Sequence, residues 1–258
     1  MEVHAHPHTA DHASHRGRKK WTHYFWEFFM LFLAVTLGFF VENQREHMVE
    51  HHREKQFMES MIEDLASDTV SLTPAIIRAA AMQNGLDSLK NYLYDIENVE
   101  KNTSVIYRQN ATYTRNILLS LNDQTSTQLR NAGGMRLIRN KDVANAIARY
   151  WKFSIILENT VNNFNAFMAD KAGSEDLIFN RKFYNMLARV DSTTTLSIYS
   201  DNPEARLMTT DKSQLISYAN FTDRLQKFIE QYIIPQVNRF KSRTKELLDL
   251  IKKSYRLK

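Results

Sequence analysis

The chain has 258 residues, no cysteine, and a formal net charge of +5 that is the balance of 34 basic and 29 acidic residues. Without cysteine it has neither a disulfide framework nor a thiolate zinc site, and charges so evenly mixed do not form the basic footprint of a nucleic-acid-binding protein. Only six glycines and four prolines occur, and apolar residues recur every three or four positions, so an all-α protein of long helices is predicted.

The first element is an apolar run of spanning length. Residues 24–41, YFWEFFMLFLAVTLGFFV, contain one charged residue, Glu27, and a run of about 18 apolar residues is long enough to cross a bilayer. Interfacial aromatic residues, Trp21, Tyr24 and Trp26, lie at its N-terminal side, and no small-residue cleavage pattern ends it, as a signal peptide would require. We therefore expect a His-rich basic tail over 1–20 and an uncleaved transmembrane helix over 21–41.

Lysine and arginine are somewhat more frequent before this helix than after it. Within about 15 positions of the helix, the basic residues are Arg16, Arg18, Lys19 and Lys20 on one side and Arg45, Arg53 and Lys55 on the other. The positive-inside rule then favours a cytoplasmic N-terminus and a C-terminal domain on the opposite side of the membrane.

One face of the transmembrane helix is predicted to pack against another helix. The three- and four-residue spacing aligns Glu27, Leu31, Ala34 and Gly38, and the pair Ala34-x-x-x-Gly38 permits close helix approach. On this face Glu27 is expected to share its charge or proton with a second copy, or with an Arg, Lys or His of a partner's helix. The alternative is that its long side chain only reaches the lipid headgroups.

A charged stalk helix over 42–70 is expected to continue the transmembrane helix and to end between Ser67 and Pro74. Two charged rows run along this stalk, Glu42, Glu46, Glu50 and Glu54 in one and His47, His51 and Lys55 in the other. Such rows suit neighbouring subunits that pack acid against base, with a dependence on pH near about 6.5. The alternative is solvated charge on a lone stalk.

Histidines indicate two candidate metal sites. Imidazoles at alternate positions of the tail can chelate Zn, Cu or Ni, and the candidate ligands are His4, His6 and His8, with His12 and His15 nearby. The alternative is a disordered polar tail. Residues 47–51, HMVEH, match the order of inverted zinc peptidases, but that chemistry needs a third ligand and a cleft that a charged stalk does not offer. No cofactor is predicted.

The rest of the chain, 71–258, is predicted to be a helical-bundle domain. The expected helices are 74–98, 104–121, a short 126–131 ended by Gly133 and Gly134, 141–170 opened by Asn140 as N-cap, and 212–255 after a loop over 191–210. In the last helix the apolar positions are Tyr218, Phe221, Leu225, Phe228 and Tyr232, then Ile233, Val237, Phe240, Leu247 and Ile251. A kink at Pro235 is the expected cause of this change of register.

Three segments resemble a family of bacterial single-span membrane proteins with a His-rich N-terminus, a helical domain after the anchor and no assigned function. The segments are MEVHAHPH, EFFMLFLAVTLGFFVENQREH followed by EKQFMESMIEDLASD, and TSTQLRNAGGMRLIRNKDVANAIARYW. The turn that the family places before a Tyr-bearing helix corresponds here to Leu129, Gly133, Leu137, Ile138, Asn140 and Tyr150. The resemblance implies this architecture and a bacterial envelope setting. Together with the charge bias, it leads us to expect an inner-membrane anchor with the domain in the periplasm. It transfers no catalytic residue.

No catalytic triad, phosphate loop or dinucleotide fingerprint occurs, which makes a non-enzymatic role the leading hypothesis. The chain is then a scaffold or accessory subunit of an oligomeric envelope complex, and its partners are the lipid bilayer and further copies or another membrane protein. Two alternatives stay open. One is a ligand-sensing domain that signals through the anchor helix, and the other is a subunit of an ion-driven membrane machine that uses Glu27.

Overall fold

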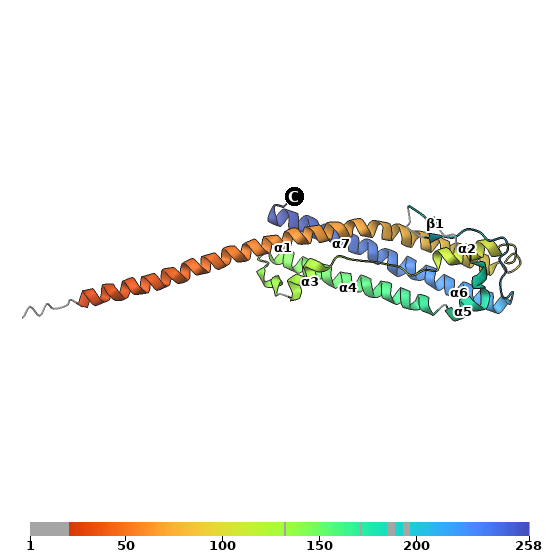
Figure 1. Ribbon diagram of the computed structural model, residues 1–258, viewed down its shortest axis with the longest axis horizontal. Helices are drawn as coiled ribbons and strands as arrows, with labels where there is room; N and C mark the ends of the chain where they lie inside the picture. The colour runs from red at the N-terminus through yellow and green to blue at the C-terminus, as the bar shows by residue number, and fades with distance from the viewer. Residues whose placement is uncertain (1–20, 132, 171, 185–188, 193–196, 258) are drawn as a thin grey trace, which may run out of the picture. The chain divides into compact units, whose positions relative to one another are not determined.

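The protein is described by a computed structural model, which places residues 21–131, 133–170, 172–184, 189–192 and 197–257 (Figure 1). The chain divides into two compact units, 1–52 and 53–258. Helices make up most of the described residues, which confirms the all-α class.

Helix α1 covers Trp21–Tyr94, 74 residues, and so belongs to both units. Its first part contains an 18-residue apolar window in which no residue is buried by the rest of the described chain. By length and composition, α1 is the one helix among the described residues that is able to cross a membrane. This agrees with the apolar run predicted from the sequence, whereas insertion into a bilayer stays a prediction.

The prediction that the stalk helix ends between Ser67 and Pro74 is wrong, because α1 continues through Pro74. Proline lacks an N–H, so the carbonyl of Val70 loses its helical partner, but Val70 is 73% exposed, where water can replace the bond. Leu72 and Met82 on either side are fully buried. Burying two such side chains contributes about 3–6 kcal/mol, which offsets the roughly 3 kcal/mol cost of an interior proline.

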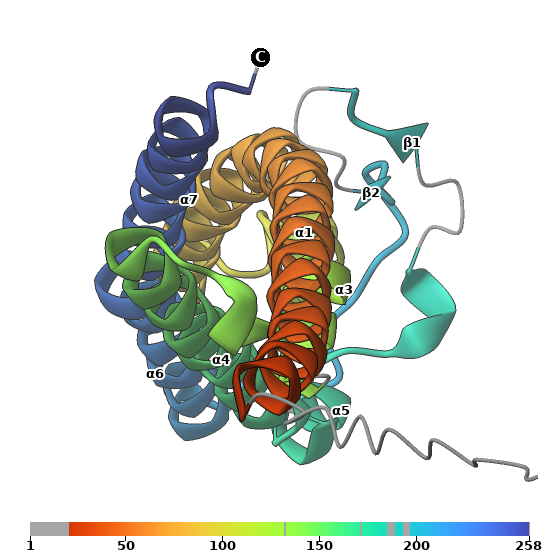
Figure 2. The same cartoon turned by 90° about the vertical axis from the view of Figure 1, so that its left-hand side faces the viewer.

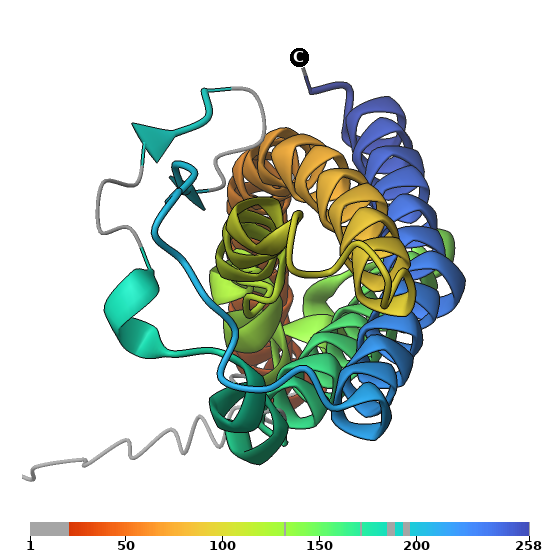
Figure 3. The same cartoon turned by 90° about the vertical axis from the view of Figure 1, so that its right-hand side faces the viewer.

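The unit 53–258 consists of the second part of α1 and the elements that pack on it. These are α2 (Thr103–Tyr113), α3 (Gln124–Asn131), η1 (Gly134–Leu137), α4 (Lys141–Ala169), α5 (Ala172–Ile178), η2 (Arg181–Phe183), β1 (Arg189–Val190), β2 (Ser197–Ile198), α6 (Lys212–Phe228), η3 (Ile229–Ile233) and α7 (Ile234–Tyr255). The second part of α1 runs beside α4, α6 and α7, and the antiparallel β1–β2 pair lies on the side of α1 away from α7 (Figures 2 and 3).

Two of the predicted local signals are confirmed in the segment between α3 and α4. Asn140 is the N-cap, and its Oδ1 accepts hydrogen bonds from the N–H groups of Asp142 at 3.0 Å and Val143 at 3.2 Å. Gly133 has φ +65°, the left-handed conformation expected after α3. The predicted start of α4 is therefore correct.

Helix α2 ends eight residues before the predicted position 121, at Tyr113. Beyond it the backbone of Ile117 bonds to a side chain of α4 and not to a neighbouring backbone group, as it would in a helix. The N–H of Ile117 donates to Asn165 Oδ1 at 2.9 Å, and Asn165 Nδ2 donates to the carbonyl of Ile117 at 2.9 Å. This pair of bonds satisfies the backbone in an extended segment, so no further helix is needed there. Helix α5 and the β1–β2 pair were not predicted.

The last predicted helix forms as α6, η3 and α7, and its change of register falls in a π-helical turn. This turn, η3, ends two residues before Pro235. Because Pro235 has no N–H to donate, a wider turn accommodates the carbonyl left without a partner. The buried positions across the turn are Leu225, Ile229, Ile233 and Val237, whereas Tyr232, expected on the apolar face, is 52% exposed.

A close contact between α1 and α2 gives a test of this packing. A Cβ added at Gly85 would overlap the ring of Tyr113 near its base, where the side chain has little freedom to move. We expect Gly85→Ala to lower the free energy of unfolding by about 1–3 kcal/mol, although alanine favours helix formation. Thermal unfolding of the full chain in detergent measures this. Gly173→Ala, where an added Cβ meets nothing within 4 Å, is the control, and equal melting of both variants would contradict the packing.

Candidate functional site

The predicted packing face of the apolar segment is exposed along α1. Leu31 is 67% exposed, and a Cβ built on Gly38 meets nothing within 4 Å. Glu27 has a partner that was not predicted, since its Oε1 lies 3.0 Å from Nε2 of His23 one turn earlier. The four-residue spacing of the two was the signal that could have revealed this pair. Sharing of the Glu27 charge with another chain stays a prediction, as does close packing at Ala34.

The predicted acidic row of the stalk does not share one environment. Glu42 pairs with Arg45, whose Nε donates at 2.9 Å, and this hydrogen bond lowers the pKa of Glu42. Glu50 Oε2 lies 3.8 Å from Nδ1 of His47, and Glu46 and His51 are exposed. Glu54 differs, because it is only 2% exposed and is bonded within the unit 53–258. The row is therefore exposed at Glu42 and Glu46, half-buried at Glu50 and buried at Glu54.

The predicted metal ligands His4, His6 and His8 lie outside the described residues, as do His12 and His15. Across residues 21–131, 133–170, 172–184, 189–192 and 197–257, no group of three or more His, Cys, Asp or Glu side chains is arranged to hold a metal ion. The HMVEH sequence at 47–51 has no third ligand in this part of the chain.

Three buried carboxylates of α1 bind the segments that lead into α3 and α4. Asp64 Oδ2 accepts from the N–H of Thr125 at 2.9 Å, in the first turn of α3. Asp68 Oδ1 accepts from the N–H of Asn122 at 2.8 Å, and its Oδ2 accepts from the hydroxyl of Tyr150 on α4.

Glu54 is bonded in the same way near the start of α4. Its Oε1 accepts from the N–H of Arg139 at 2.8 Å and from the hydroxyl of Tyr255, in the last turn of α7, at 2.5 Å. The carboxylate oxygens of Glu54, Asp64 and Asp68 thus accept hydrogen bonds from backbone N–H groups and tyrosine hydroxyls of the same chain. The role of these carboxylates is therefore structural. From the sequence, Glu54 was predicted only as a member of the acidic row of the stalk, and its burial was not predicted.

Burial controls the electrostatics around Asp68. Loss of water raises the pKa of the Asp68 carboxyl above its ordinary value, and the hydrogen bonds from Tyr150 and Asn122 lower it in part. The nearby Asp64 raises it further. Burial and the adjoining Asp68 likewise raise the pKa of Tyr150, so its hydroxyl keeps its proton and donates to the carboxylate.

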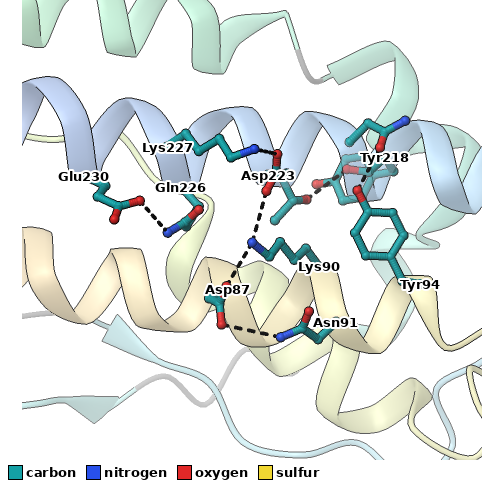
Figure 4. A network of polar contacts seen from close by, with 11 residues as sticks. Asp87, Lys90, Asn91, Tyr94, Tyr218, Asp223, Gln226, Lys227 and Glu230 are labelled. Atoms are coloured by element: carbon teal, nitrogen blue, oxygen red, sulfur yellow. Dashed lines mark hydrogen bonds and ion pairs between the residues drawn. The ribbon is translucent and has the colours of Figure 1, made fainter.

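A second polar network joins α1 to α6 (Figure 4). Nζ of Lys90 lies 2.9 Å from Asp87 on its own helix and 3.0 Å from Asp223 on α6, and Nζ of Lys227 lies 2.8 Å from Asp223. The hydrogen bonds from the two lysines lower the pKa of Asp223. The Tyr94 hydroxyl extends the network by donating to Asn220 Oδ1 at 2.7 Å. These contacts fix the relative position of the two helices.

A third network, around Asn110, joins α2, α5 and α6. Nδ2 of the fully buried Asn110 donates to Glu175 Oε1 at 2.8 Å and to the Tyr184 hydroxyl at 2.6 Å, while Oδ1 accepts from the Tyr218 hydroxyl at 2.6 Å. Burial raises the pKa of Tyr218, which therefore stays protonated and donates. A cavity of about 420 Å³ lies beside this network, and its arginines are already engaged, Arg115 with Tyr199 and Arg181 with Asp176.

A larger cavity, of about 660 Å³, is a groove between α4 and α7. Arginines and apolar side chains line it, and none of these residues was singled out for function from the sequence except Tyr150. Among the described residues, the buried polar clusters act as structural hydrogen-bond networks, whereas the groove lining includes charged residues that are exposed to solvent, Arg149, Arg239 and Glu246. The groove is therefore the cavity best suited to bind another molecule.

Comparison with models of known protein families, with curated proteins and with solved structures finds no match to this chain. The resemblance to single-span membrane proteins stays an expectation from the sequence. Function has to be inferred from the chain's own apolar segment, networks and groove.

The buried Asp68 gives a test that depends on pH. Asp68→Asn keeps an acceptor for Asn122 and a partner for Tyr150, so we expect it to be milder than Asp68→Ala, which leaves those groups unpaired at a cost of about 1–3 kcal/mol. Because burial raises the pKa of Asp68 above 3.8, the folded state binds its proton more tightly than the unfolded state does.

The parent chain should therefore gain stability relative to Asp68→Asn as the pH falls from about 7 toward the ordinary carboxyl range near 4. Urea unfolding of both full chains in the same detergent, at a series of pH values, measures the difference. Carboxyls that do not interact with Asp68 titrate alike in both proteins and cancel. A difference that does not change with pH, or that moves the other way, would show that Asp68 is not held in a buried, desolvated site.

Proposed function

We propose that the protein is a membrane-anchored, non-enzymatic helical protein that acts as a scaffold or accessory subunit of a membrane complex. The first part of α1 is the anchor, and the unit 53–258 is a helical-bundle domain. The observation that carries this proposal is an apolar segment of spanning length that nothing in the described chain covers, joined without a break to a unit with its own complete core.

The exposure of the apolar segment supports membrane insertion. Phe28, Leu31 and Phe39 are 67%, 67% and 74% exposed. Leaving each such side chain in water is less favourable than burying it by about 1.5–3 kcal/mol. A bilayer removes that cost for every side chain around the helix. Surrounding protein would do so only on the faces that it covers.

The glycine of the apolar segment supports association with another helix. Glycine inside a helix costs about 1 kcal/mol relative to alanine, and at Gly38 no close approach within the described chain offsets that cost. A second helix packed over Ala34 and Gly38 would use the missing Cβ. The partner is then a second copy or another membrane protein.

The use of the buried polar groups supports a scaffold more than an enzyme. Asp68, Glu54 and Asn110 each bond to structural groups of the same chain. Catalytic acids and bases are usually placed where a substrate can reach them. The charge bias around residues 21–41 and the family resemblance favour the bacterial inner membrane, with the domain in the periplasm.

Alkaline extraction of membranes tests the anchor. The full chain should stay in the membrane pellet at high pH and salt, because apolar contact with lipid does not depend on charge. A chain lacking 21–41 should move to the supernatant. Release of the full chain under the same conditions would contradict membrane insertion.

Substitution on the proposed packing face tests association. Gly38→Leu places a large side chain where helices approach, and we expect it to weaken the complex at least tenfold, about 1.4 kcal/mol. Thr36→Leu places the same leucine side chain about 160° around the helix and is the matched control. Cross-linking in native membranes followed by size analysis measures both. Equal cross-linking of the two variants and the parent would remove this face from the proposal.

A further inference from the structure

The groove between α4 and α7 combines positive charge with an apolar floor. The two helices pack side by side (Figures 2 and 3), and the groove between them encloses about 660 Å³, within the range of about 300–1,000 Å³ that is typical of ligand sites. Arg149 comes from α4, and Arg239 and Arg243 come from α7. Both helices are therefore needed to form it.

The arginines of the groove are not neutralised within the described chain. In that part of the protein, Arg149 and Arg239 take part in no ion pair, and the charged group of Arg243 lies 3.5 Å above the centre of the Phe153 ring. The one acidic residue in the lining, Glu246, accepts a hydrogen bond from Ser242 at 3.0 Å. Three guanidinium groups and one carboxylate leave the groove with a net positive charge.

The placement of these charges is unfavourable for the helix alone. Arg239 and Arg243 are four residues apart, so like charges lie together on one face of α7 at a cost of a few tenths of a kcal/mol. An anion bound between the helices would attract both arginines and so offset the repulsion between them. Guanidinium groups suit this task because they bind phosphate and carboxylate oxygens in pairs of parallel hydrogen bonds.

The floor of the groove suits a hydrocarbon chain. Tyr150 and Leu247 are buried at its base, and Phe153 and Leu250 are half-buried on its walls. An ion without an apolar part would leave the exposed portions of Phe153 and Leu250 in water. A molecule with an anionic head and an apolar chain can contact both the arginines and the apolar side chains. Its apolar chain contributes about 25 cal/mol for each Å² of apolar surface that it buries.

We propose that the α4–α7 groove binds a single-chain amphiphile with a phosphate or carboxylate head. The head lies against Arg149, Arg239 and Arg243, and the chain lies along Phe153 and the leucines. This activity goes beyond a scaffold role and does not rest on it, because all of the groove belongs to the unit 53–258.

Titration with hexyl phosphate tests the proposal, because this probe is soluble and has both parts. The full chain is held in nanodiscs of neutral phosphatidylcholine, and the heat from empty nanodiscs is subtracted. We expect hexyl phosphate to bind at least tenfold more tightly than either inorganic phosphate or hexanol, and to weaken as salt is raised. Equal binding of inorganic phosphate would overturn the apolar half of the proposal.

Variants locate the binding. Arg149→Gln with Arg239→Gln should weaken hexyl phosphate binding at least tenfold while the thermal midpoint stays unchanged, because both side chains are exposed. The control is Arg130→Gln with Arg224→Gln, two arginines that lie over the rings of Trp151 and Phe167 outside the groove. Equal loss in both pairs, or no loss in the first pair, would overturn the assignment.

A partner protein is the competing occupant. If hexyl phosphate does not bind, but the Arg149→Gln and Arg239→Gln pair loses a protein that co-purifies with the parent, the groove takes an acidic protein surface and the amphiphile proposal fails. The membrane anchor is unaffected by any of these results, since alkaline extraction tests it separately.

Discussion

The unit 53–258 depends on buried carboxylates that come from a single helix. Glu54, Asp64 and Asp68 are 2%, 7% and 1% exposed on α1. A buried carboxylate is costly unless donors surround it, and here the donors are backbone N–H groups at 122, 125 and 139 together with two tyrosine hydroxyls. The need to satisfy these acids therefore determines where the connections into α3 and α4, and the end of α7, lie along α1.

Features with a local signal could be predicted from the sequence, and features set by distant contacts could not. The N-cap at Asn140 and the left-handed Gly133 depend on a few neighbouring residues, and both are as expected. Continuation of α1 through Pro74 depends on what buries Leu72, which comes from elsewhere in the chain. Glu54 shows the same limit, because spacing places it on a row but does not say what covers that row.

The candidate site divides in the same way. The apolar segment is evident from composition alone, and the His23–Glu27 pair follows from their spacing. The groove could not be predicted from the sequence, because its arginines come from helices far apart in the chain. Each of these arginines, taken alone, is indistinguishable from ordinary surface charge. Helix α1 thus has two roles in the proposed function: its apolar segment anchors the protein, and its buried acids organise the unit that offers the groove.

Native mass spectrometry of the full chain, gently extracted from its own membranes, tests the scaffold role most directly. We predict a complex of defined stoichiometry, made of several copies or of this chain with another membrane protein, that survives dilution in mild detergent. A bare monomer in every mild detergent tested would contradict the scaffold role. In that case the anchor would serve only to hold the domain at the membrane.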